Sequence, residues 1–127
     1  MRAGRAAILA PLLLVTACAT PIERTRLPFE SPSIEIAPGA PYERCVRVEA
    51  GDRLYFSYRV DPPMSFAIRR QSGTATVSFV VREASRDDSG IFFVPETQDY
   101  CLHWEPSIAD APWPTLLRFE IRLNTAS

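Results

Sequence analysis

The sequence predicts an all-β protein, an antiparallel sandwich of about seven or eight strands of the jelly-roll type, closed by one disulfide. Apolar and polar residues alternate with period two in several short runs, the pattern of half-buried strands. Turn residues separate these runs. No stretch beyond the apolar N-terminal run has a helical periodicity of useful length.

The chain opens with a secretory signal. Arg2 and Arg5 precede an uncharged run over residues 6–15, and these are the basic and apolar parts of such a signal. The run contains Pro11 and is well short of the roughly 20 residues that cross a bilayer. Residues 1–17 are therefore expected to be removed from the mature protein.

The signal ends in Val15-Thr16-Ala17-Cys18, a branched apolar residue and two small residues before a cysteine. This block resembles the lipobox of bacterial lipoproteins. The resemblance implies an acylated Cys18, and several acyl chains anchor a protein firmly where one would dissociate. The alternative is an ordinary cleaved signal with an incidental cysteine. Ala19, in place of Asp, favours the outer membrane by the sorting rule of enteric lipoproteins, so the expected location is the cell envelope, facing the periplasm.

A proline-rich segment follows the lipobox. Its prolines are Pro21, Pro28, Pro32, Pro38 and Pro41. Such a segment predicts an extended tether, and at about 3.1 Å per residue its first fifteen or so residues would span roughly 45 Å. A short strand is expected at residues 33–37. The predicted organisation is a signal at 1–17, a lipidated tether at 18–41 and one domain at 42–127.

Four longer runs carry the alternating pattern of the sandwich. The residues expected to point inward are Leu54, Phe56, Tyr58 and Val60, then Met64, Phe66 and Ile68, then Val77, Phe79 and Val81, and finally Leu117, Phe119, Ile121 and Leu123. Turns are expected at Ala50-Gly51-Asp52, Asp61-Pro62-Pro63, Ser72-Gly73 and the polar stretch 85–90.

Cys45 and Cys101 remain once Cys18 is lipidated, an even pair in an oxidising compartment. A disulfide between them would close a loop of about 57 residues and contribute on the order of 4 kcal/mol. The alternatives are two free thiols or a redox or metal pair, which no CxxC spacing and no second histidine supports.

The charge of the chain argues against nucleic acid as a partner. The formal net charge is -1, and it falls to about -3 once the two arginines of the signal are removed. Binding to nucleic acid needs a basic face.

Four segments, RCVRVEAGDRLYFSYRVD, MSFAIRR with the following SG, SGIFFVPE and QDYCLHWEP, occur in an order that resembles the GOLD domain, the β-sandwich of the p24 cargo receptors. The resemblance covers about 80 residues between Cys45 and Leu123. It implies a sandwich with a binding role and carries the two family cysteines over to Cys45 and Cys101. The family commonly places an Asn where Glu105-Pro106 follows Trp104 here, and p24 trafficking is not implied.

Few residues point to catalysis. His103 is the lone histidine, and it is expected to be an exposed or edge residue because no nucleophile motif accompanies it. The stretch Asp87-Asp88-Ser89-Gly90 lacks the pattern of a calcium loop and is expected to form a polar hairpin turn.

Two sets of residues are candidates for recognition. Arg69-Arg70 and Arg118/Arg122 would form a basic patch unless acidic neighbours balance them, which is the expectation. Trp113 lies between two prolines and is expected either to plug one end of the core, the favoured reading, or to be an exposed hot spot. Tyr55 points outward on its strand and would extend that patch.

The expected function is that of a lipid-anchored, non-catalytic binding module with a protein partner in the envelope and without a cofactor or metal. The alternatives are an inhibitor of a wall-degrading hydrolase or protease, a structural subunit of an envelope assembly, and a hydrolase that depends on His103.

Overall fold

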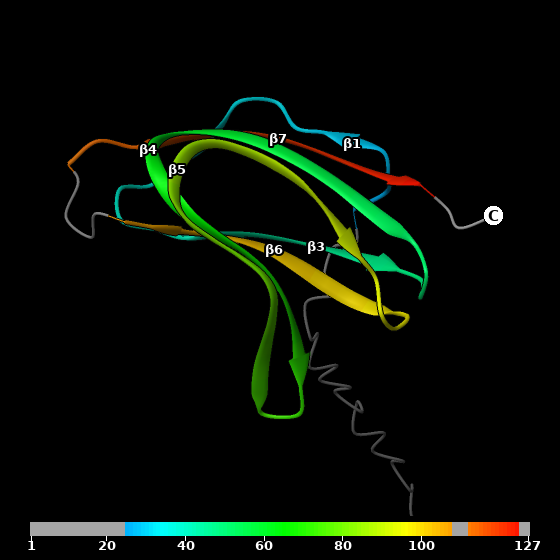
Figure 1. The fold of residues 1–127 in the computed structure, drawn as a ribbon. Helices are drawn as coiled ribbons and strands as arrows, with labels where there is room; N and C mark the ends of the chain where they lie inside the picture. The colour runs from blue at the N-terminus through cyan, green and yellow to red at the C-terminus, as the bar shows by residue number, and fades with distance from the viewer. Residues whose placement is uncertain (1–24, 108–111, 125–127) are drawn as a thin grey trace, which may run out of the picture.

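The computed structural model describes residues 25–107 and 112–124, and it shows an all-β chain (Figure 1). In chain order the strands are β1 (Phe29–Glu30), β2 (Ile34–Ile36), β3 (Tyr42–Val48), β4 (Arg53–Ser72), β5 (Ala75–Phe93), β6 (Gln98–Pro106) and β7 (Thr115–Asn124). All pairings are antiparallel. The predicted fold class is confirmed. In the described part of the chain, no helix has the length and apolarity to cross a bilayer. The signal, the lipobox and Cys18 lie outside the described residues.

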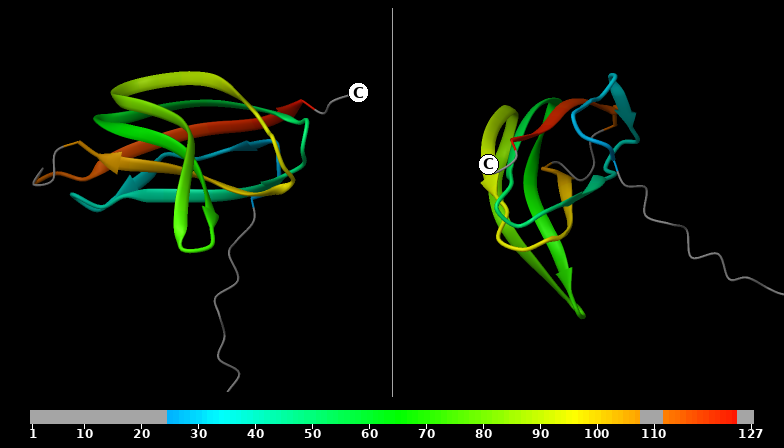
Figure 2. Two further views of the ribbon diagram at one scale, coloured as in Figure 1. Left: turned by 60° about the horizontal axis from the view of Figure 1, so that its bottom comes forward. Right: turned by 90° about the vertical axis from the view of Figure 1, so that its right-hand side faces the viewer.

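The sheet curls because β4 belongs to two layers. The sheet order is β1-β7-β4-β6-β3, with β2 also on β7 and β5 on β4. The first part of β4, up to Asp61, pairs with β7, and its second part, from Met64, pairs with β6. The strand β5 follows β4 along both parts. One layer therefore holds β1, β2 and β7, the facing layer holds β3 and β6, and β4 and β5 complete both (Figures 1 and 2).

The core lies between the two layers and is rich in aromatic side chains. Alternate residues of β4 and β7 face it as the period-two pattern predicts, and Tyr100 and Trp104 join them from β6. The ring of Phe66 lies 4.9 Å from that of Tyr58 and 5.0 Å from that of Trp104, centroid to centroid. Such aromatic pairs add about 0.5–1.5 kcal/mol each beyond the burial of their area.

Two expected turns are confirmed and two are wrong. Gly51 and Gly73 have φ of 90° and 64°, a conformation that glycine adopts without strain at a tight turn. Asp61-Pro62-Pro63 is not a turn, because it lies inside β4 where the strand bends from one layer to the other and the register with β5 shifts. Prolines are tolerated at such irregular points of a ladder.

The polar stretch 85–90 also lies inside a strand. Asp87, Asp88 and Ser89 of β5 pair with Arg59, Tyr58 and Ser57 of β4, so the expected polar hairpin turn is wrong. The residues are polar because the bend of β5 is exposed to solvent, and a solvent-exposed bend has the same composition as a turn.

The inward face expected for Val77, Phe79 and Val81 is wrong in part. The register between β4 and β5 shifts by one residue beside Phe79, so Val80 lies opposite Ile68 of the core. Val81 is then turned outward and is 66% exposed, and Val77 is exposed as well. A β-bulge of this kind reverses the alternation of a strand, and the sequence gives no sign of it.

The domain begins earlier than expected. The strand predicted at residues 33–37 is confirmed as β2, and β1 precedes it. The N–H of Thr25 donates to the carbonyl of Cys45 (3.3 Å), and the Phe29 ring packs on Phe119 with centroids 5.4 Å apart. The part of the predicted tether from Thr25 onward is therefore folded on the domain, and residues 19–24 lie outside the described residues.

Candidate functional site

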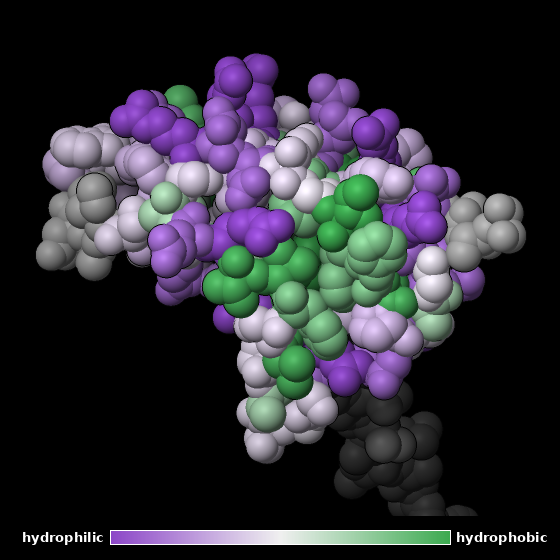
Figure 3. Space-filling view, in the orientation of Figure 1, coloured by the Kyte–Doolittle hydropathy of each residue, from purple (hydrophilic) through white to green (hydrophobic). Residues whose placement is uncertain are grey.

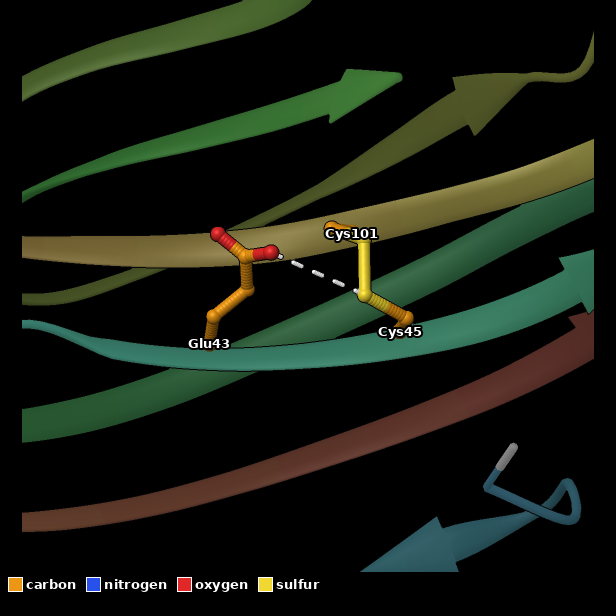
Figure 4. A group of neighbouring side chains, drawn as sticks. All are labelled: Glu43, Cys45 and Cys101. Carbon is orange, nitrogen blue, oxygen red and sulfur yellow. Dashed lines mark hydrogen bonds between the residues drawn. A yellow bond between two sulfur atoms is a disulfide. The ribbon is translucent and has the colours of Figure 1, made fainter. Parts of the chain in front are cut away.

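The predicted disulfide between Cys45 and Cys101 is present. The two cysteines are register partners on β3 and β6, with their Cα atoms 3.9 Å apart. Glu43 lies on the same side of β3, and its Oε1 is 3.7 Å from the Cys45 sulfur (Figure 4). A disulfide sulfur has no hydrogen to donate and is not a thiolate, so this contact is neither a hydrogen bond nor a set of metal ligands.

His103 is held in a cluster of charged side chains. Its strand, β6, lies between β3 and β4, so the expected edge position is wrong, and the side chain is only 14% exposed. Its Nδ1 lies 2.8 Å from Glu43 Oε2 and 3.0 Å from Arg69 Nη2, and its Nε2 contacts Glu105. A general base needs a free ring nitrogen directed at the group it deprotonates, and both nitrogens are engaged here. This geometry is that of a structural ion cluster on the outer face of the sheet.

The four arginines that were candidates for a basic patch are divided between the layers. Arg69 pairs with Glu43 at 2.9 Å and Arg70 pairs with Glu96. Arg118 and Arg122 lie on β7 in the other layer. The expected acidic neighbours are thus confirmed for the first pair.

A cluster of aromatic, aliphatic and arginine side chains lies on the outward face of β7, β4 and β5. We call it the Tyr55 surface, and its members are Arg53, Tyr55, Ile91, Phe93 and Arg122. Tyr55 is the register partner of both Ile91 and Arg122, and Arg53 is the partner of Phe93. Alternate residues of a strand share a face, so all five point away from the core. Phe93 is 66% exposed and Ile91 is exposed beside it.

The arginines of this surface stack on its rings. The Cζ of Arg122 lies 5.3 Å from the centroid of the Tyr55 ring, and that of Arg53 lies 5.7 Å from the centroid of Phe93. Such contacts contribute about 0.5–1 kcal/mol at exposed sites and hold the rings in a fixed orientation. Tyr, Phe and Arg are also the residue types enriched at the centres of protein interfaces.

The surface dips beside Tyr55. Ser57 and Ser89 are register partners with small side chains, and the row they form lies between the taller rows of Tyr55 and Arg59. A concavity of about 380 Å³ opens there, with Tyr55 and Arg122 in its wall. A second one of about 720 Å³ continues past Arg59, and it shares Ser57 and Ser89 with the first.

Trp113 is exposed and lies far from the Tyr55 surface. Its exposed fraction is 54%, so the favoured reading as a plug over the core is wrong. Trp113 precedes the start of β7, whereas Tyr55 pairs with Arg122 near the end of that strand. At about 3.3 Å per residue the two lie roughly 30 Å apart along β7, so Tyr55 and Trp113 do not form one patch.

Tyr58 is a titratable side chain in the core, beside the polar bend of β5. Burial raises the pKa of Tyr58, and the ring is only 5% exposed. Its hydroxyl makes no hydrogen bond with the described residues, and the nearby Ser85 hydroxyl donates to the Asp87 carbonyl. Arg82 and Asp88 form an ion pair of 3.3 Å at the same bend of β5.

Sequence reasoning placed Tyr55 on an outward face but missed its neighbours. Ile91 and Phe93 join Tyr55 only through the register of β5 on β4, and that register depends on the bend and the bulge of the two strands. The sequence offered one signal. In a strand, Ile91, Phe92 and Phe93 alternate between the two faces, so they cannot all be buried.

Comparison with known proteins adds little to this geometry. No family model matches the chain, and no curated protein matches it. Among solved structures, a solution NMR structure of a de novo designed double-stranded beta-helix is similar, with 19% identity and a TM-score of 0.39, over 74% of this chain and 99% of that chain. At this TM-score the likeness carries no functional information.

Proposed function

We propose that this chain is a lipid-anchored module of the bacterial cell envelope that binds a protein partner through the Tyr55 surface. The carrying observation is that Tyr55, Ile91 and Phe93 share one outward face. Exposed apolar side chains of this size on one face, with arginines stacked on the rings, have the composition of a binding hot spot. The concavity beside Tyr55 offers room for a side chain of the partner.

The proposed role is recognition without catalysis. The Tyr55 surface consists of aromatic, aliphatic and guanidinium groups, which supply contact area and hydrogen-bond donors to a partner. We also propose that the folded part of the chain is a GOLD-like domain. It rests on the order of the four segments and on the position of the two cysteines.

The anchor rests on the lipobox resemblance and is tested separately. Cells that express the full chain are grown with a labelled fatty acid, and the protein is then isolated. The wild-type protein should carry the label and fractionate with membranes, and Cys18→Ala should do neither. A labelled Cys18→Ala protein would contradict the lipobox assignment.

The partner is sought with a photo-crosslinking amino acid placed at single positions of the anchored protein in cells. The chain has no lysine, so amine-reactive reagents would report poorly on it. Position 93 tests the Tyr55 surface, and position 47 is the control, because Arg47 is exposed on β3 in the other layer. We expect one dominant captured protein at 93 and not at 47. Equal capture at both positions, or none at 93, would contradict the proposal.

The inhibitor alternative has one supporting observation. The hairpin formed by the end of β4 and the start of β5 extends beyond the sandwich (Figure 2), a shape suited to entering the cleft of an enzyme. Thr74 lies in its turn, beside Gly73. Capture of a hydrolase or protease at position 74, with nothing at 93, would favour this alternative. Capture of subunits of a large assembly would favour the structural role.

A further inference from the structure

The edge strands of the sheet differ in length and in charge. The edge strand β3 carries charged residues at Glu43, Arg44 and Arg47, and β1 and β2 have 2 and 3 residues. Charged and very short edge strands are common devices against unwanted pairing. In contrast, β5 has 19 residues and, in the described part of the chain, pairs with β4 alone.

The bend of β5 is protected by its own side chains. Asp88 Oδ1 accepts a hydrogen bond from the N–H of Ser89 (2.7 Å), and the Ser85 hydroxyl donates to the carbonyl of Asp87 (3.0 Å). These backbone groups are therefore occupied at the bend. The first arm of β5, residues 75–81, has no such side-chain hydrogen bonds to its backbone among the described residues, and its one irregularity is the bulge at Phe79.

This first arm has the sequence ATVSFVV, which contains no charge, no glycine and no proline. Val77 and Val81 are exposed on it, and hydrophobic surface extends from the sandwich onto the hairpin (Figure 3). An apolar, uncharged edge strand is a template for pairing with another strand.

We propose that residues 75–81 pair with the same residues of a second copy of this chain, antiparallel about a two-fold axis at Ser78. A two-fold interface uses one patch twice, so the patch must be compatible with itself. Because the arm carries no charge, the pairing places no like charges opposite each other. The bulge at Phe79 shifts the register by one residue, so Arg82 and Glu83, which follow the arm, would face Ala75 and Thr74 of the second copy, which are also neutral.

The shape of the molecule permits this pairing. The hairpin that carries the first arm projects from the sandwich (Figures 1 and 2). When two such hairpins lie antiparallel, the two sandwiches are at opposite ends of the paired segment and do not collide. The layer of β3, β6, β4 and β5 would then continue across the axis into the same layer of the second copy. This contact is separate from the Tyr55 surface and does not depend on the proposed function.

The first test measures the oligomeric state of the full mature chain, made without lipid by Cys18→Ala. Analytical ultracentrifugation between about 1 and 100 μM should show a monomer–dimer equilibrium. Val81→Lys should weaken the dimer at least tenfold. Each copy would then carry a charged side chain on the paired edge strand, and such charges oppose strand pairing. The matched control is Ile91→Lys, on the other arm of β5, which should leave it within twofold. Both side chains are exposed, and circular dichroism checks that both variants fold.

The second test fixes the position of the axis in the anchored protein. Ser78→Cys should give a disulfide-linked homodimer on a non-reducing gel, because the two residues meet at the axis. Ser57→Cys, exposed on the outer face of β4, is the control and should remain monomeric. A wild-type chain that stays monomeric up to 100 μM, equal crosslinking at the two positions, or a photo-crosslink from position 78 to a different protein would overturn the proposal.

Discussion

The disulfide offers a quantitative prediction about stability. Cys45 and Cys101 are 56 residues apart, and the bond ties the edge strand β3 to β6. In the chain-entropy model a closed loop of about 57 residues restricts the unfolded chain by roughly 4 kcal/mol. Domains of this size have a total stability of about 5–15 kcal/mol, so this bond accounts for a large share. We expect Cys45→Ala with Cys101→Ala to lose about 4 kcal/mol and roughly 15–30 °C in Tm.

The assay is urea unfolding of the wild-type protein and the double variant, followed by tryptophan fluorescence. Both proteins also carry Cys18→Ala, so replacing Cys45 and Cys101 together leaves no free thiol that would form new disulfides. The variant should unfold at lower urea. Wild-type protein kept under non-reducing conditions should resist alkylation at both cysteines. A stability difference under about 1 kcal/mol would show that the bond does not restrict the unfolded chain as argued. Alkylation without reduction would show that the bond is absent.

Three further substitutions test the packing of the core and the buried hydroxyl of Tyr58. Tyr58→Phe removes a buried hydroxyl that makes no hydrogen bond with the described residues, so urea unfolding should show unchanged stability or a gain of up to about 1 kcal/mol. The pKa of Tyr58 is raised above 10.0, mainly by burial, so its contribution to stability is fully present below about pH 10 and is lost as pH rises beyond it. Wild-type stability should therefore fall more steeply above pH 10 than that of Tyr58→Phe, and parallel curves would contradict the burial argument. Gly90→Ala should cost about 1–3 kcal/mol, because the new Cβ would lie 2.8 Å from Cζ of Phe56, and a neutral result would mean that the ring moves freely. Phe66→Ala should cost about 3–5 kcal/mol, since its ring contacts Tyr58 and Trp104, and a loss below 1 kcal/mol would place it outside the core.

Period-two alternation predicted the straight parts of the fold well. The inward residues of β7 and of both parts of β4 are those that the pattern indicates, because a straight strand has one buried face. The pattern failed where a strand bends. Pro62 and Pro63 have the composition of a turn, yet β4 runs through them and changes layers, and one extra residue at Phe79 turned Val81 to solvent.

The candidate site was harder to predict because it depends on register. Tyr55 could be placed on an outward face from its own strand. Ile91 and Phe93 come beside it through pairings that span the bend of β5, and no local signal reports such pairings. The partners of His103 were hidden for the same reason, since Glu43 is 60 residues away in the sequence and next to it in the sheet.

The proposed binding role is tested most directly by substituting two exposed aromatic residues that lie far apart, Phe93 on β5 and Trp113 before β7. Phe93→Ser removes the most exposed ring of the Tyr55 surface, and Trp113→Ser removes an aromatic side chain of similar exposure outside it. The measurement is the amount of the captured envelope partner that co-purifies with each anchored variant at equal abundance. We expect Phe93→Ser to reduce co-purification at least tenfold, as for a hot-spot residue, and Trp113→Ser to leave it within twofold. Loss with Trp113→Ser and retention with Phe93→Ser would contradict the account.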